Sequence, residues 1–196
     1  MHALGVIALS YSAFQRSLQD LYAFHPNQQK VPNELTDLYY TSLNEKSQLK
    51  AIRTVFASFE KDPAVIALVN NLIDFFDWCT HARNELLHSE MYPSMFGGDK
   101  DKLYLIKQAS KKDKTPSYKW LTVQELRDIA DKIEQGKRNC AGIIIYLRMR
   151  DVPLDQLSLS YRGVIDTLPP QPLVIPPPLD TSPHPQHGKP GHLKKR

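Results

Sequence analysis

Two residues near the middle of the chain, Arg83 and His88, could together carry out acid–base chemistry on a phosphate ester. They are the ends of the stretch Arg83-Asn-Glu-Leu-Leu-His88. A guanidinium is always charged and binds phosphate oxygens through its fork of N–H donors. An imidazole, which ordinarily titrates near pH 6.5, can both accept and donate a proton close to neutral pH. The alternative is that both residues are merely the charged edge of a core helix.

These residues belong to the most apolar helix that the sequence predicts. Asp62 and Pro63 supply an N-cap and a proline at the first helical position, which marks the start. The helical pattern continues to about Met91, before Tyr92 and Pro93. On a helical wheel six polar residues of this helix fall within an arc of about 80°. They are Asn70, Asp74, Asp77, His81, Asn84 and His88.

This polar stripe is either a solvated face or the edge of a functional cleft. Its short Asn, Asp and His side chains differ from the Lys and Glu of most solvated faces, and Arg83 falls on the apolar side, between the directions of Leu72 and Phe76. Because an unpaired buried guanidinium is costly, Arg83 must reach solvent, pair with a carboxylate, or line a cleft that takes an anion.

The spacing of Arg83 and His88 favours a site shared between two chains. Five residues correspond to about 140° around a regular helix and about 7.5 Å along it. One chain would not direct both side chains at the same atom unless the helix end loosened. Two copies packed along this helix could gather both pairs in one cleft through two-fold symmetry.

Helical periodicity dominates residues 1–167, which predicts an all-α domain of four or five helices. We expect a long first helix over residues 3–24 and shorter ones near 35–39 and 49–59. Residues 102–108 and 118–123 alternate around a lysine-rich turn, which predicts a small β-hairpin. Thr122 and Glu125 form a capping-box pattern that begins the last long helix, which ends before Pro153.

The composition changes near residue 168. Nine of the fifteen prolines lie in residues 168–196, which predicts a disordered or polyproline-II tail after the helical domain. This tail is either a plain extension or a proline-rich ligand for an adaptor. Its net charge is +3 of the total +4, which leaves +1 for residues 1–167. The helical domain is therefore no general polyanion binder.

The two cysteines and the short apolar runs predict the cellular compartment in which the protein is found. Cys79 and Cys140 occupy apolar helical positions without metal-ligand spacing, which predicts buried free thiols in a reducing cytoplasm. No apolar run approaches the roughly 20 residues that span a bilayer, and the N-terminus lacks a secretory pattern. We expect a cytoplasmic protein with no metal, no cofactor and no membrane partner.

The motif and the order of the helices resemble the HEPN domain superfamily. Arg83-Asn-Glu-Leu-Leu-His88 matches the R-x4-H form of its signature, with the polar Asn84 after the arginine and a long helix leading into the motif. The resemblance covers roughly residues 3–150, and residues 3–24 are similar to the opening helix of such domains. It implies a HEPN-like helical bundle that forms a homodimer with a composite active site.

The resemblance also implies an activity, that of a metal-independent endoribonuclease acting as a toxin or phage-defence effector. His88 would be the general base or acid at the ribose 2′-hydroxyl, and Arg83 would hold the scissile phosphate. Asn84 would orient either side chain or contact RNA. The product would carry a 2′,3′-cyclic phosphate. The partners would be an RNA substrate, a second copy, and an antitoxin or defence protein.

Further residues could assist from the same stripe and from the hairpin. Asp77 and His81 would support the site. The hairpin turn would either add positive surface for RNA or form a solvated loop tip. Its lysines are Lys111, Lys112 and Lys114.

The competing interpretation is a non-catalytic HEPN-like module for dimerisation and partner binding. Arg83 would then belong to an internal ion pair. Its partner would be Asp74 or Asp77 of the other subunit, or an acidic residue of a neighbouring helix.

Overall fold

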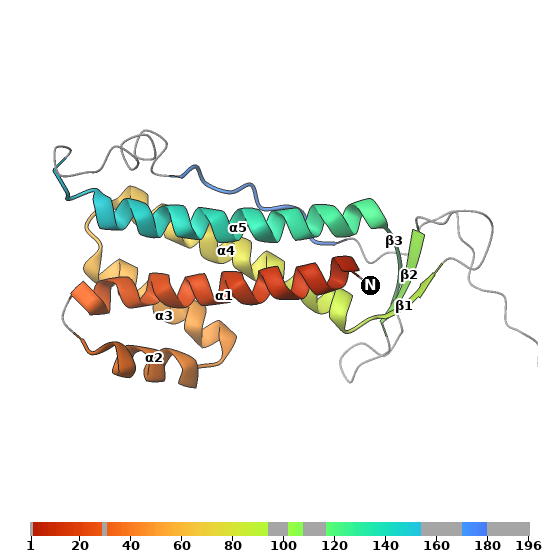
Figure 1. Cartoon of the computed structure of the whole chain (residues 1–196), viewed down its shortest axis with the longest axis horizontal. Coiled ribbons are helices and arrows are strands. Elements are labelled where there is room, and N and C mark those ends of the chain that lie inside the picture. Colours follow the sequence, from red (N-terminus) through yellow and green to blue (C-terminus); the bar gives the residue numbers. More distant parts are fainter. Residues whose placement is uncertain (1, 29–30, 94–101, 108–116, 154–169, 180–196) are drawn as a thin grey trace, which may run out of the picture.

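The computed structural model describes residues 2–28, 31–93, 102–107, 117–153 and 170–179. The order of elements in that part is α1 (His2–Gln28), α2 (Asn33–Ser42), α3 (Glu45–Phe59), α4 (Pro63–Leu87), β1 (Glu90–Pro93), β2 (Lys102–Lys107), β3 (Ser117–Thr122) and α5 (Val123–Met149). The helices α1, α4 and α5 lie lengthwise beside one another, and the sheet is at one end (Figure 1). The predicted helical domain with a small hairpin before its last helix is confirmed.

Side-chain caps fix where α3 and α4 begin. Asn44 accepts a hydrogen bond from the Ser47 N–H (3.0 Å), which starts α3. Asp62 accepts one from the Ala64 N–H (2.9 Å), and Pro63 follows it as the first residue of α4. Each cap satisfies an amide that has no partner within its helix.

The capping box predicted for the last helix is also present. Thr122 Oγ1 accepts from the Glu125 N–H (3.1 Å), and Glu125 Oε2 accepts from the Thr122 N–H (2.6 Å). Two otherwise unpaired amides are thus satisfied at the point where β3 turns directly into α5.

The helix α4 ends at Leu87, earlier than the predicted Met91. His88 is its C-cap residue, with φ −98° and ψ 6°, and Glu90–Pro93 form the strand β1. This strand pairs with β2 in antiparallel register, with Glu90 opposite Ile106. Strand pairing therefore replaces the last helical turn that periodicity predicts.

The sheet has the order β1-β2-β3 with antiparallel neighbours. The predicted hairpin is the pair β2 and β3, in which Leu105 lies opposite Lys119. The third strand, β1, was not predicted. Leu105 and Leu121 are buried and join the helical core, so the sheet closes the end of the bundle next to the end of α4.

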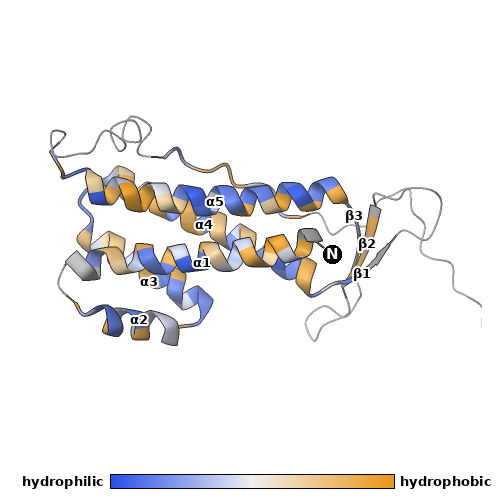
Figure 2. Cartoon of the chain, in the orientation of Figure 1, coloured by the Kyte–Doolittle hydropathy of each residue, from blue (hydrophilic) through white to orange (hydrophobic). Residues whose placement is uncertain are grey.

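The core lies between α1, α4 and α5, and α1 packs most extensively against α5. Each long helix carries hydrophobic and hydrophilic stretches, as expected for amphipathic helices around a shared core (Figure 2). At Gly136 of α5 the helix packs tightly against side chains of α1 and α4. A Cβ atom there would lie 2.5 Å from the Phe14 ring and 2.9 Å from the Phe75 ring.

Residues 170–179, hereafter the strap, lie along α4 and α5 (Figure 1). Leu173 is only 6% exposed, and Asn71 of α4 exchanges two hydrogen bonds with its backbone. The strap is non-helical, as its prolines predict, but these residues have a fixed place in the fold. Sequence analysis missed this because the docking depends on one buried leucine and on amide side chains far away in the chain. Residues 168–169 and 180–196 of the predicted tail lie outside the described residues.

Both cysteines are buried and free, as predicted. Burial raises the pKa of the Cys79 thiol to about 12 and raises that of Cys140 as well. Neither thiol is therefore a nucleophile near neutral pH. Among the helices described, none has an apolar stretch long enough to cross a membrane.

Candidate functional site

Arg83 reaches from α4 to the aromatic ring of Tyr11 on α1. Its Cζ lies 4.3 Å from the ring centroid, which is a cation–π contact. Its Nη1 donates to Oδ1 of the adjacent Asn84 at 2.7 Å. The side chain is half-buried. The Tyr11 ring therefore stabilises the guanidinium charge on one face, while part of the guanidinium stays accessible to solvent.

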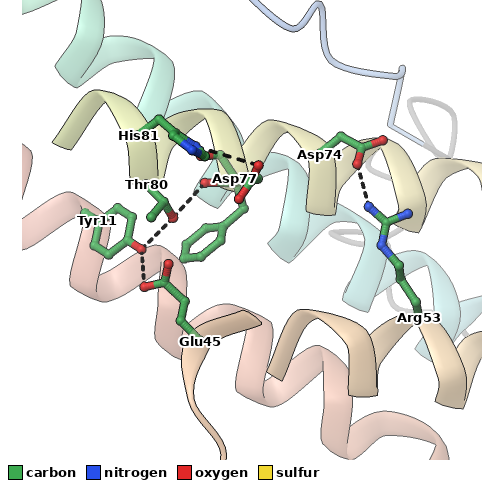
Figure 3. Close-up of polar contacts among 8 residues, drawn as sticks. Tyr11, Glu45, Arg53, Asp74, Asp77, Thr80 and His81 are labelled. Carbon is green, nitrogen blue, oxygen red and sulfur yellow. Dashed lines mark hydrogen bonds and ion pairs between the residues drawn. The ribbon is translucent and has the colours of Figure 1, made fainter. Parts of the chain in front are cut away.

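Tyr11 is held in place by a short chain of hydrogen bonds (Figure 3). Its hydroxyl donates to Glu45 Oε2 at 2.8 Å and therefore accepts from Thr80 Oγ1, also at 2.8 Å. Burial raises the pKa of Tyr11 well above its ordinary value, and the neighbouring Glu45 carboxylate raises it too. A neutral tyrosine thus links α1, α3 and α4 directly beneath Arg83.

The two ends of the motif are joined through the backbone of Asn84. Its carbonyl accepts from the His88 N–H at 3.0 Å, while its side chain accepts from Arg83. The His88 side chain is exposed at the end of α4, and it makes no hydrogen bond or ion pair with any residue that the structure describes. Within one chain, no hydrogen bond or ion pair joins the Arg83 and His88 side chains.

The polar stripe of α4 is divided into two parts. Toward the start of the helix, Arg53 of α3 donates to Asp74 (Figure 3). It also donates to Asn70 (3.3 Å), so the two contacts tie α3 to α4. These two stripe residues therefore hold helices together. Farther along, His81 Nδ1 lies 2.8 Å from the Asp77 carbonyl oxygen and 3.7 Å from Oδ2 of the same residue.

The proposed supporting residues have different surroundings. Asp77 and His81 are largely exposed, pair with each other and do not contact Arg83. Asn84 does contact Arg83. The lysines of the hairpin turn lie outside the described residues. They are Lys111, Lys112 and Lys114.

Sequence analysis missed the residues that position Arg83, namely Tyr11, Thr80 and Glu45. Thr80 precedes Arg83 by three residues and so shares its face of α4. Tyr11 occupies a core position of the first helix, where its ring alone would account for its burial. Only the packing of α1 on α4 reveals that a phenol rather than a carboxylate meets the arginine.

The charge of Arg83 has no acidic counterpart in the described part of the chain. Among the described residues no carboxylate forms an ion pair with it, and nearby acids have other partners: Glu45 bonds to Tyr11, Asp74 to Arg53, and Asp77 to His81. A guanidinium has five N–H donors, and the hydrogen bond to Asn84 uses one of them. The remaining donors can bind an anion such as a phosphate group.

Within the described ranges, no group of three or more His, Cys, Asp or Glu side chains could hold a metal ion. Comparison of the chain with protein-family models, with curated proteins and with solved structures gave no match.

Proposed function

We propose that this protein is a metal-independent endoribonuclease of the HEPN type that acts as a homodimer, in the manner of a toxin or phage-defence effector. The observation that carries the proposal is the state of Arg83. Its guanidinium lies over the Tyr11 ring and donates a hydrogen bond to the Asn84 side chain, without a carboxylate partner among the described residues. The non-catalytic alternative requires that partner within the fold or across a subunit interface.

The proposed reaction is an attack by the ribose 2′-hydroxyl on the neighbouring phosphorus. His88 removes the proton from this hydroxyl, the P–O5′ bond breaks as the 2′,3′-cyclic phosphate forms, and the leaving 5′-oxygen takes up a proton from solvent. Arg83 binds the non-bridging oxygens, on which negative charge increases in the transition state. Asn84 keeps the guanidinium in place through the hydrogen bond to Nη1. The nucleophile belongs to the RNA itself.

A dimer would bring Arg83 of one chain close to His88 of its partner. Within one chain no hydrogen bond or ion pair joins the two side chains, and on a regular helix they would be about 140° apart. His88 is exposed at the end of α4, and Leu87 beside it is 44% exposed although it is hydrophobic. An interface along this end of the helix would cover both of these side chains.

The first experiment is incubation of the purified protein with total cellular RNA in EDTA, followed by end-group analysis of the fragments. We expect cleavage with 2′,3′-cyclic phosphate ends, and a loss of about 100-fold or more in His88→Ala, which is typical of a missing general base. His81→Ala, at an exposed histidine of the same helix that bonds to Asp77, is measured beside it and tests whether His81 supports the site. Intact RNA with the wild-type protein, or equal cleavage by His88→Ala, would contradict the proposal.

A second experiment tests whether the site is composite. Arg83→Ala and His88→Ala chains are each expected to be inactive alone. Unfolding and refolding them together forms mixed dimers in which one of the two composite sites retains both residues. Partial recovery of cleavage supports a site shared between chains. No recovery, when mixed dimers are present, means that each chain uses its own pair.

A further inference from the structure

The strap is held by side chains that recognise its backbone. Asn71 donates from Nδ2 to the Leu173 carbonyl oxygen (3.0 Å) and accepts from the Leu173 N–H at Oδ1 (2.7 Å). Asn139 of α5 donates to the carbonyl of Gln171 (2.9 Å). Such paired bonds to one residue copy the pairing of neighbouring strands, so the groove between α4 and α5 recognises an extended chain.

Apolar and aromatic contacts add selectivity. Leu173 is buried between the helices, and Trp78 Nε1 donates to the carbonyl of Pro177 at 3.0 Å. Beside it a cavity of about 430 Å³ is lined by Trp78, Trp120 and the prolines 176–178. Proline-rich segments bind to aromatic-lined grooves because their extended conformation is already favoured before binding.

The strap makes few buried contacts for its length. Leu173 is its one buried residue, whereas Val174 is 85% exposed and Ile175 is 43% exposed. A segment held by Leu173, by the partly buried Leu179 and by a few hydrogen bonds can detach without unfolding the helices beneath it. Detachment would leave Asn71 and Trp78 without the partners that the strap supplies.

We propose that the α4–α5 groove is a peptide-binding site for a proline-rich segment of a partner protein, which replaces the strap. The segment it selects has the strap's pattern, a leucine followed after two residues by consecutive prolines, as in Leu173-Val-Ile-Pro-Pro. The site is separate from the proposed ribonuclease site, because Asn71 and Trp78 point roughly 120° or more away from Arg83 around α4. The strap occupies the groove until such a segment competes for it.

The two tryptophans of the chain allow a direct test, because both line this cavity. In the full-length chain, Leu173→Asp puts a carboxylate where the leucine is buried and should release the strap. We expect a red shift of the tryptophan emission with unchanged helix content. Val174→Asp is the matched control, since that neighbouring side chain is exposed and its substitution should leave the spectrum unchanged.

Binding is then measured with a fluorescent synthetic peptide of residues 170–179. In the wild-type chain the tethered strap competes with the peptide at an effective concentration on the order of millimolar. Leu173→Asp releases the strap, so this variant should bind the peptide at least about tenfold more tightly than the wild-type chain. Adding Asn71→Ala should weaken this binding about tenfold, because two hydrogen bonds are lost. No saturable binding to Leu173→Asp, or binding that is insensitive to Asn71→Ala, would overturn the proposal.

Two further measurements cover the remaining outcomes. If Leu173→Asp loses helix content, the experiments on this variant are replaced by a measurement on the wild-type chain, the hydrogen exchange of the Leu173 amide. Added peptide should speed this exchange, and no change would refute displacement. A wild-type dimer that dissociates in a folded Leu173→Asp variant would assign the groove to the strap of a second copy and overturn the partner proposal.

Discussion

At the scale of single residues, Tyr11 determines what Arg83 can do. A carboxylate in its place would neutralise the guanidinium and compete with any anion. An aromatic face stabilises the charge by about 0.5–2 kcal/mol, depending on its exposure, and leaves the N–H edges available. The hydroxyl of the same tyrosine is bonded to Thr80 and Glu45, so the ring has little freedom to turn away.

Two substitutions separate these roles of Tyr11. Tyr11→Phe keeps the ring beneath Arg83 and loses the hydrogen bonds, so we expect a stability loss of about 1 kcal/mol and retained RNA cleavage. Tyr11→Leu also removes the aromatic face and should reduce cleavage much further. Urea unfolding and initial cleavage rates, measured where both variants are folded, give the comparison. Equal cleavage by the two variants would show that the ring does not position Arg83.

At the scale of elements, the contact of α5 with α1 and α4 depends on the missing side chain of Gly136. The nearby rings of Phe14 and Phe75 occupy the space that a Cβ would need. Glycine inside a helix ordinarily costs about 0.5–1 kcal/mol relative to alanine. Here the close approach of three helices offsets that cost.

Alanine substitutions at two helical glycines should therefore have opposite effects. Gly136→Ala forces two aromatic rings to move, and we expect a loss of about 1–3 kcal/mol in the free energy of unfolding. Gly5→Ala in α1 meets nothing within 4 Å and should stabilise the protein by about 0.5–1 kcal/mol. Chemical unfolding of both variants tests this. A stabilised Gly136→Ala would mean that the rings move at no cost.

Most helices and the hairpin could be predicted from sequence because their signals are local. Asp62 with Pro63, and Thr122 with Glu125, cap their helices through hydrogen bonds to amides two or three residues away. Burial of Cys79 follows equally from its position on an apolar helical face. These short-range patterns can be recognised in a single sequence without knowledge of the fold.

Features that depend on distant residues were not predictable in this way. The end of α4 is decided by the pairing of β1 with β2, and a short apolar strand has no period that distinguishes it from a helical turn. The contact of Arg83 with Tyr11 joins two helices whose packing angle no local pattern gives. The place of Leu173 depends on Asn71, a residue 102 positions earlier.

At the scale of the whole molecule, a buried cluster joins the ends of three helices. Glu60, between α3 and α4, accepts hydrogen bonds from the Lys61 and Asp62 amides and pairs with Arg150 at the end of α5 (3.0 Å). His25 of α1 lies 3.6 Å from the same carboxylate. Burial lowers the pKa of His25 although Glu60 opposes this shift. The pKa of Glu60 is also lowered: burial alone would raise it, but Arg150 and the amides outweigh that effect.

This cluster predicts that acid destabilises the fold. In the unfolded chain His25 takes up a proton near its ordinary pKa of 6.5, and in the folded protein only at lower pH. Its contribution is complete above about pH 6.5 and is lost as the pH falls through the folded pKa. Protonation of Glu60 causes a second loss below its ordinary pKa of 4.5.

Urea unfolding at a series of pH values between about 7.5 and 4 measures this dependence. His25→Phe, which suits the surrounding Phe24 and Phe56 rings, should flatten the curve between about pH 7 and 5. An undiminished slope in His25→Phe would assign the acid sensitivity to other groups.

The strap also has a consequence for the order in which this protein matures during synthesis. The helices α1 to α5 are translated before residue 170, so they can associate while the groove is still empty. Asn71 and Trp78 receive their backbone partners only when positions 173 and 177, about a hundred residues later, have emerged. A nascent chain therefore passes through an interval in which its own bundle is assembled and its peptide groove is open to any other ligand nearby.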